Sequence, residues 1–195
     1  MKRRHIVRLK ALLTPIGSPG LTPVRRGDTG DAMGGKWIVR RATTDDSPTV
    51  MGIAAAAWRD TYADLLTPET IESFIEHAYS PARVVSRITD DHFYVAEDAK
   101  GIAAFADALE REDRLDLLAV YALPDRRYQG AGTALLQKLL RDFPGRDISA
   151  DVIDGNRKGE VFYERRGFVP RERLEATLFG EPVVERRWWR LAASS

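Results

Sequence analysis

The stretch from Leu115 to Thr133 constrains this chain more than any other part of it. It reads LDLLAVYALPDRRYQGAGT: an apolar strand, a turn marked by Pro124, and a Gly-rich loop that opens an amphipathic helix. Gly130 and Gly132 allow the backbone to approach a ligand closely, and the helix that follows adds the positive end of its dipole. This local pattern is typical of a site that holds a phosphorylated ligand on backbone N–H groups.

Two common nucleotide-binding signatures do not match this loop. A Walker A loop requires Gly-x-x-x-x-Gly-Lys-Ser/Thr, which the chain lacks. A dinucleotide-binding fingerprint requires a third glycine three residues after Gly132, where Leu135 stands, and its βαβ unit normally comes early in a larger domain. Taken alone, the loop does not separate a phosphate site from an ordinary loop before a helix, so its function depends on the rest of the chain.

Composition excludes several classes of protein. The 195 residues suffice for one domain, or for one domain and an extension. The near balance of 30 Lys and Arg against 29 Asp and Glu argues against a dedicated nucleic-acid binder. The absence of cysteine excludes disulfides, Cys-ligated zinc and a Cys nucleophile, and the three histidines have no ligand spacing, so we expect no metal. Without a membrane-spanning run or a signal-peptide core, we expect a cytoplasmic protein with no membrane partner.

Residues 1–35 differ from residues 36–195. They hold seven Lys or Arg, two Asp, three Pro and six Gly residues, a composition that favours a loose basic extension over a packed element. We therefore predict a boundary at residue 35. Met33, just before the first expected strand, leaves open whether residues 1–32 belong to the natural protein. A basic arm that docks on a partner such as a nucleic acid is the alternative for this segment.

Beyond residue 35 the periodicity predicts an α/β domain with a mixed sheet. Helices are expected to start at Ser47-Pro48 and Thr67-Pro68, and a third short helix at Ser80-Pro81. Short turns join three strands into an antiparallel meander. The strand that follows the Gly-loop helix should lie parallel to the strand before that loop. The predicted order is β-α-α-β-β-β-α-β-α-β-β, and the expected strands are 37–42, 93–97, 102–109, 115–123, 148–153, 174–179 and 183–191.

A second element, from Asn156 to Phe168, changes the interpretation of the loop. It places Phe162-Tyr163 in a short helix that ends at Gly167. The sequence from 36 to 191 resembles the GNAT superfamily of acyl-CoA-dependent N-acyltransferases. The resemblance is carried by the joint occurrence, at this spacing, of Val120-Tyr121-Ala122-Leu123-Pro124, Arg127-x-x-Gly130-x-Gly132-Thr133, and Asn156 followed by Phe162-Tyr163-Glu164-x-x-Gly167-Phe168.

The resemblance implies both a fold and a co-substrate. The fold would be a single GNAT-like domain over 36–195, with a central mixed, mostly antiparallel sheet of about seven strands, a V-shaped splay between the fourth and fifth strands where a bulge opens the sheet, and about four helices. Acetyl-CoA would lie with its pantetheine along the strand before the loop and its pyrophosphate on the loop. The cofactor-binding residues carried over are Val120, Tyr121, Ala122, Arg127, Tyr128, Gln129, Gly130, Ala131, Gly132, Thr133, Asn156 and Phe162.

The resemblance also implies a reaction. A neutral amine attacks the acyl carbonyl directly, without a covalent enzyme intermediate, and Tyr163 matches the superfamily's general acid for the leaving thiolate. Asp116 stands where the histone acetyltransferases of the superfamily place a catalytic Glu, and is the candidate base, with Glu110 and Glu112 as rivals. Trp58 and Tyr62 are candidate acceptor-binding residues, although a spacing of four residues is equally typical of side chains that pack a helix on a sheet.

The function expected from the sequence is therefore an N-acetyltransferase that acts on a primary amine of a small molecule or protein. The alternative is a non-catalytic acyl-CoA-binding or partner-binding module with the same fold. The sequence does not identify the amine. The Trp188-Trp189 pair near the last strand suits either the core or the interface of a homodimer.

Overall fold

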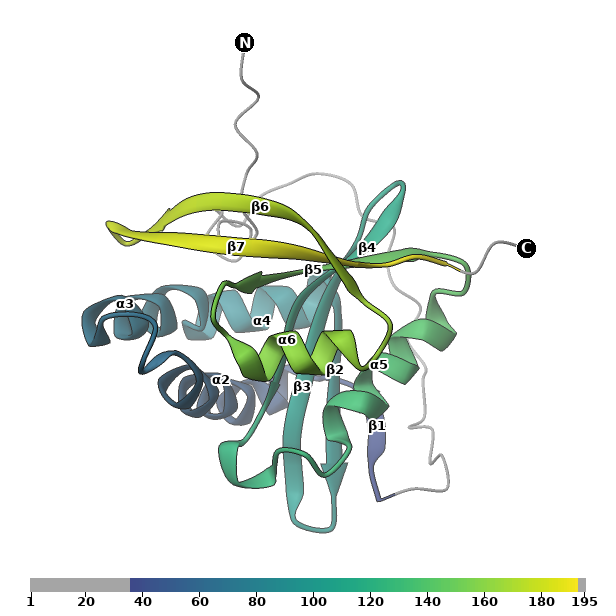
Figure 1. The fold of residues 1–195 in the computed structure, drawn as a ribbon. Coiled ribbons are helices and arrows are strands. Elements are labelled where there is room, and N and C mark those ends of the chain that lie inside the picture. Colours follow the sequence, from purple (N-terminus) through teal and green to yellow (C-terminus); the bar gives the residue numbers. More distant parts are fainter. Residues whose placement is uncertain (1–35, 193–195) are drawn as a thin grey trace.

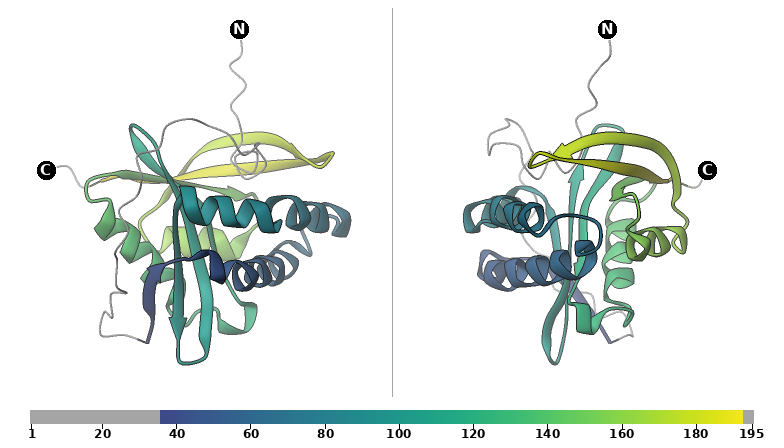
Figure 2. Two further views of the ribbon diagram at one scale, coloured as in Figure 1. Left: turned by 180° about the vertical axis from the view of Figure 1, so that it is seen from behind. Right: turned by 60° about the vertical axis from the view of Figure 1, so that its left-hand side comes forward.

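The computed structural model describes residues 36–192, which form one seven-stranded sheet with helices on both faces (Figure 1). The strand order is β1-β2-β3-β4-β5-β7-β6. Helices α2, α3 and α4 cover one face, and α5 and α6 cover the other, as the side view in Figure 2 shows. The strands are β1 Ile38–Arg41, β2 His92–Asp98, β3 Gly101–Glu110, β4 Arg114–Ala122, β5 Asp147–Ile153, β6 Val169–Leu178 and β7 Glu181–Arg190.

Five α-helices flank the sheet in the described part of the chain, against about four predicted. The predicted third short helix is α4, which has ten residues with Pro81 in its first turn and packs beside α2. The helices are α2 Ser47–Tyr62, α3 Pro68–Ala78, α4 Pro81–Asp90, α5 Ala131–Asp142 and α6 Arg157–Glu164, with short 3₁₀ turns at Thr44–Asp46 and Pro124–Arg126. The predicted single α/β domain with a mixed sheet is confirmed.

Two apolar layers hold the helices to the sheet. Trp58 of α2 and Phe74 of α3 are fully buried in the apolar layer on one face. On the other face Leu135 and Leu139, one helical turn apart in α5, are fully buried over β3 and β4. Because both faces are covered, the central strands carry apolar residues in both directions, and the sheet is a rigid support for the loops at its ends.

The predicted splay between β4 and β5 is confirmed. The two strands pair in parallel only from Arg114–Leu117 to Asp147–Ala150. On the other side of β4 the register with β3 shifts, so that Leu118 is an extra residue between Leu117 and Ala119. Such a bulge bends its strand, and from this residue onward β4 parts from β5.

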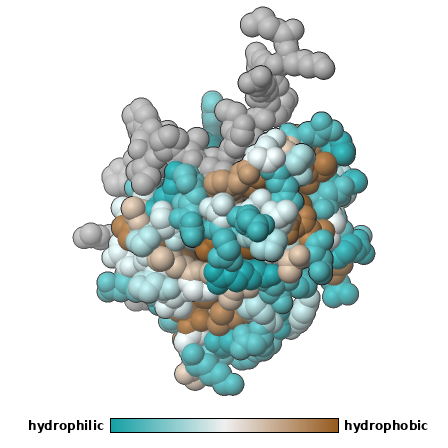
Figure 3. Space-filling model, turned by 90° about the vertical axis from the view of Figure 1, so that its left-hand side faces the viewer, coloured by the Kyte–Doolittle hydropathy of each residue, from teal (hydrophilic) through white to brown (hydrophobic). Residues whose placement is uncertain are grey.

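The β6–β7 hairpin arches over the α3 end of the molecule (Figures 1 and 2). Near its turn, the Glu181 carboxylate accepts a hydrogen bond from the Thr67 main-chain N–H at 3.1 Å, and Phe179 lies edge-on to His77 of α3. The face that carries this turn mixes hydrophobic patches with hydrophilic residues (Figure 3). The turn of the hairpin is thus held against both ends of α3.

Several sequence predictions are not tested by the fold. The expected extension, residues 1–35, lies outside the described residues, so the boundary stays a prediction. Trp188 is buried in the core, and the Trp189 indole donates to Glu172 at 2.8 Å; a homodimer also stays a prediction. Between residues 36 and 192, no helix has the length and apolar content to cross a membrane.

Candidate active site

A cavity of about 550 Å³ opens where β4 and β5 part. The cavity is lined by the splayed end of β4, the end of β5, and the Gly-rich loop with the first turn of α5. Residues of α6 form a further wall. The end of α2 completes the cavity through Ala57, Thr61 and Tyr62. The bulge therefore produces an opening bounded by exposed strand edge on one side and by a helix N-terminus on the other.

The Gly-rich loop has the backbone conformation of an anion site. Gly130 has φ +95° and caps α5, a conformation that suits glycine. Tyr128 has φ +61° and is 88% exposed; a left-handed aromatic residue costs about 1 kcal/mol of local strain, the kind of outlier that gathers at functional loops. The first N–H groups of α5 have no acceptor within the helix, and Ala131, Gly132 and Thr133 line the cavity.

Gly132 is required by close packing rather than by its φ angle. A Cβ atom here would lie 3.0 Å from Cε2 of Phe162 and 3.6 Å from Cγ1 of Val120. The first turn of α5 thus lies close to α6 and β4, and a side chain larger than that of glycine would fill the space between them. The glycine keeps the helix N-terminus open to the cavity.

Arg166 adds a cation that sequence reasoning missed. Its guanidinium donates to the Phe162 carbonyl at 2.7 Å and to the Thr133 hydroxyl, and it lies 3.9 Å above the Phe162 ring. Burial lowers the pKa of Arg166. An Arg before the Gly that ends a helix is an ordinary sequence, so only its contact with Thr133, 33 residues away, reveals a charge beside the first turn of α5.

Arg127 lines the same cavity but is held by the end of α2. Its guanidinium donates to the Asp60 carboxylate and to the Thr61 hydroxyl, the latter at 3.0 Å. Lys158 of α6 also reaches Asp60, at 2.7 Å. Hydrogen bonds from Lys158 and Arg127 lower the pKa of Asp60. This carboxylate therefore links the Gly-rich loop to α6 across the end of the splay.

Three side chains that bear a hydroxyl or an amide also line the cavity. Tyr163 of α6 is 8% exposed, with its ring edge-on to Phe162 and Phe168. Asn156 accepts a hydrogen bond from the Gly159 N–H, which caps α6, and its amide donates to the Tyr62 hydroxyl at 3.4 Å. Burial, with the charge of Glu185, raises the pKa of Tyr62. Tyr62 is consequently a neutral phenol that can donate a hydrogen bond.

The structure gathers most of the predicted site residues around this cavity. Among residues 36–192, the predicted residues that do not line it are Trp58, Asp116 and Gln129. Trp58 is fully buried and stacked on Phe74, with ring centroids 3.7 Å apart, so it packs α2 in the core. The rest line the cavity: Val120, Tyr121, Ala122, Arg127, Tyr128, Gly130, Ala131, Gly132, Thr133, Asn156, Phe162, Tyr62 and Tyr163.

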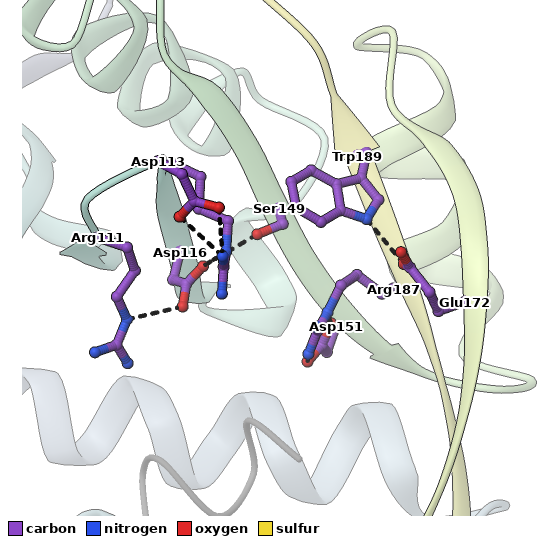
Figure 4. A network of polar contacts seen from close by, with 9 residues as sticks. Arg111, Asp113, Asp116, Ser149, Asp151, Glu172, Arg187 and Trp189 are labelled. Carbon is purple, nitrogen blue, oxygen red and sulfur yellow. Dashed lines mark hydrogen bonds and ion pairs between the residues drawn. The ribbon is translucent and has the colours of Figure 1, made fainter. Parts of the chain in front are cut away.

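Asp116 lies in an ion-pair network on the paired half of β4 (Figure 4). It is 3% exposed and accepts hydrogen bonds from Arg111 at 3.1 Å, Arg114 at 2.8 Å and Ser149 at 3.1 Å. Of its rivals, Glu110 pairs with Arg146 at 2.8 Å, and Glu112 is exposed. The network of Asp116 ties the meander to β5.

Asp151 is the carboxylate that sequence reasoning missed. It lies on β5 beyond the last residue paired with β4, and in the described part of the chain it is the one acidic residue that lines the cavity. Arg187 of β7 holds it with two hydrogen bonds, at 2.8 and 2.9 Å (Figure 4). An Asp between the apolar residues Ala150 and Val152 was the available signal.

The fold and the cavity together define an α/β domain with a cavity between two splayed parallel strands and a helix N-terminus at its edge. Comparison with known proteins supports this class. Residues 89–170 match the family profile described as an acetyltransferase (GNAT) domain. A spermidine N(1)-acetyltransferase of Thermoplasma acidophilum is 25% identical over 161 residues, which span 77% of this chain and 96% of that protein. A probable N-acetyltransferase of Mycobacterium tuberculosis is 23% identical over 139 residues, 67% and 78% of the two chains.

Solved structures share the fold. The PaiA N-acetyltransferase of Thermoplasma acidophilum in complex with coenzyme A superposes with a TM-score of 0.64 at 23% identity, over 77% of this chain and 97% of that one. A GCN5-related N-acetyltransferase from Rhodopseudomonas palustris has a TM-score of 0.66 at 20% identity, over 89% and 99%. The family profile, the curated relatives and the solved structures together support a GNAT N-acetyltransferase. Residues 36–192 contain no cluster of three or more His, Asp or Glu side chains that could hold a metal ion.

Proposed function

We propose that this protein transfers the acetyl group of acetyl-CoA to a primary amine by direct attack, with the domain spanning 36–195. The observation that carries the proposal is that one cavity joins the free edge of β4, the N-terminus of α5 and the Tyr163 side chain. These are the parts needed to hold a thioester, bind its phosphates and protonate its leaving group.

The cavity suits coenzyme A chemically. The pantetheine amides can pair with the unpaired edge of β4 at Val120–Ala122, as an added strand would. The pyrophosphate would lie on the loop from Tyr128 to Thr133, where helix N–H groups and Arg166 supply positive charge. The relative solved with coenzyme A bound has the same fold, which supports this placement.

The chemistry needs few groups from the protein. The amine nitrogen forms a bond to the acetyl carbon while the carbonyl oxygen takes up negative charge, which backbone N–H groups near Val120–Ala122 would stabilise. The carbon–sulfur bond then breaks, and Tyr163 donates its phenolic proton to the coenzyme A sulfur. Most of the acceleration comes from holding amine and thioester together.

The attacking amine must lose a proton, and we assign its removal to Asp151 acting through water. Asp151 lines the cavity and is oriented by Arg187, whereas Asp116 is engaged by two arginines on the paired half of β4. We further propose that Tyr62, held by Asn156, contacts the acceptor.

The experiment is a panel of amines assayed for release of the coenzyme A thiol, with coenzyme A binding measured separately by calorimetry. The panel begins with spermidine, the substrate in the name of one relative, and includes amino acids and peptides with free N-termini. We expect saturable thiol release with at least one amine class. Binding of coenzyme A without acetylation of any amine would instead support the non-catalytic acyl-CoA-binding module.

A further inference from the structure

Trp37 lies just before the edge strand β1. It contacts Gln129 of the Gly-rich loop, which is 92 residues away in the sequence. Its indole N–H donates to the main-chain carbonyl oxygen of Gln129 at 2.7 Å. The side chain is 6% exposed. A Cβ atom at Gly130 would lie 3.7 Å from the indole nitrogen, so the ring packs directly against the loop.

This hydrogen bond determines how one peptide group of the loop is oriented. The carbonyl of Gln129 and the N–H of Gly130 belong to the same planar trans peptide, in which the two groups point in opposite directions. Because the carbonyl is held by Trp37, the Gly130 N–H points away from the indole. Gly130 itself lines the cavity.

The loop needs such support because its backbone is unusual. Tyr128 and Gly130, on either side of Gln129, both have positive φ angles. A residue in a sparsely populated conformation persists only where surrounding structure determines it. Trp37 is itself held: the Arg126 guanidinium lies 5.1 Å from its ring centroid, and Arg126 pairs with Asp98. The Lys36 ammonium contacts the Gln129 side chain.

We propose that Trp37 is a positioning residue for the pyrophosphate of coenzyme A, acting through the Gln129–Gly130 peptide. The inference rests on the proposed function in that it takes coenzyme A as the ligand, but it concerns binding alone. It predicts an effect confined to ligands that carry the pyrophosphate.

The test is Trp37→Phe, which removes the indole N–H and retains an aromatic ring. We expect the Kd for coenzyme A, measured by calorimetry, to rise about fivefold, as for one net hydrogen bond. The Kd for pantetheine, which lacks the pyrophosphate, should not change. The matched control is Trp188→Phe: Trp188 is also 6% exposed, and its indole nitrogen has no hydrogen-bond partner in the described structure.

The inference is overturned if Trp37→Phe binds coenzyme A like the wild type, if pantetheine binding weakens equally, or if Trp188→Phe has the same effect. Should Trp37→Phe fail to fold, benzothienylalanine at position 37 keeps the bicyclic ring and replaces the N–H by sulfur, with the same expectation. These readouts need no turnover. A Kd shift without acetylation of any amine therefore supports Trp37 while contradicting the proposed function.

Discussion

The paired half and the splayed half of β4 and β5 contain the same kinds of residue but serve different purposes. In the paired half, Arg114–Leu117 against Asp147–Ala150, the ladder satisfies the backbone and Asp116 is surrounded by Arg111, Arg114 and Ser149. In the splayed half, Leu118–Ala122 no longer pairs with β5, and its residues line the cavity. Each half carries an Arg-paired Asp, but only Asp151 of the splayed half reaches the cavity.

The difference shows how small a change in a strand creates a site. One extra residue, Leu118, separates a pair of strands that is saturated with hydrogen bonds from a pair whose facing edges are open to a ligand. An edge that a neighbouring strand does not satisfy is a liability in most proteins. Here it provides the surface on which an extended ligand can pair.

The largest expected effect comes from Tyr163→Phe at the splayed half. Loss of the general acid should lower kcat about a hundredfold or more, while the Kd for coenzyme A stays near the wild-type value because the ring is retained. Steady-state kinetics and calorimetry measure the two quantities. Tyr94→Phe is the control, since this buried tyrosine donates to Asp142, away from the cavity. Unchanged turnover in Tyr163→Phe would contradict the acid role.

Asp116→Asn probes the paired half and should act on stability. Removing the charge leaves Arg111 and Arg114 without their shared buried partner, which we expect to cost about 2 kcal/mol of the free energy of unfolding. Urea denaturation measures this, and kcat should remain within about twofold of wild type because Asp116 does not line the cavity. Asp151→Asn is the counterpart and should lower kcat. If Asp116→Asn instead abolished turnover without loss of stability, Asp116, and not Asp151, would be the general base that deprotonates the amine.

Gly132→Ala narrows the cavity beside the splayed half of β4 and β5 and changes no charge. The new methyl group would lie 3.0 Å from Phe162, so α5 or α6 must shift, and we expect the Kd for coenzyme A to rise about tenfold. Gly52→Ala on α2 has open space around its Cβ and should leave binding unchanged. If both variants bound coenzyme A equally well, the contact between α5 and α6 would not determine the shape of the coenzyme A site.

A pH series examines the junction between the halves. Asp107 is fully buried opposite Ala119, the first residue after the bulge. Burial and the charge of Asp107 raise the pKa of Asp91 to about 8, so the folded state holds a proton that the unfolded state releases. Stability is therefore full at low pH and is lost as pH rises from about 4 through about 8.

Asp91→Asn removes this titration. Its free energy of unfolding, measured in urea from about pH 6 to about pH 9, should fall less steeply than that of the wild type. Parallel curves for the two proteins would show that Asp91 is not the titrating group.

Local patterns predicted much of the fold. Three helices with Pro in their first turn begin within a residue of their predicted starts, because a preceding polar residue and Pro act on the backbone next to them. The β2–β3–β4 meander and the parallel β4–β5 pair followed from short turns and an intervening helix. Tyr163 and the Gly-rich loop were found because their motifs are contiguous.

Side chains brought together from distant segments could not be predicted in this way. The contacts of Arg166 with Thr133, Lys158 with Asp60 and Trp37 with Gln129 span 33, 98 and 92 residues. They depend on how far each helix reaches over the sheet, which no local pattern specifies.

The amino-acid sequence by itself determined the elements, their order and the residues of the Gly-rich loop, since these follow from periodicity, capping and backbone freedom. Only the tertiary structure decided which carboxylate reaches the cavity. Asp116 and Asp151 are both acids among the apolar residues of their strands, and they differ because the ladder between β4 and β5 ends at Leu117 and Ala150. Where the ladder ends depends on the bulge at Leu118, a property of three strands packed together.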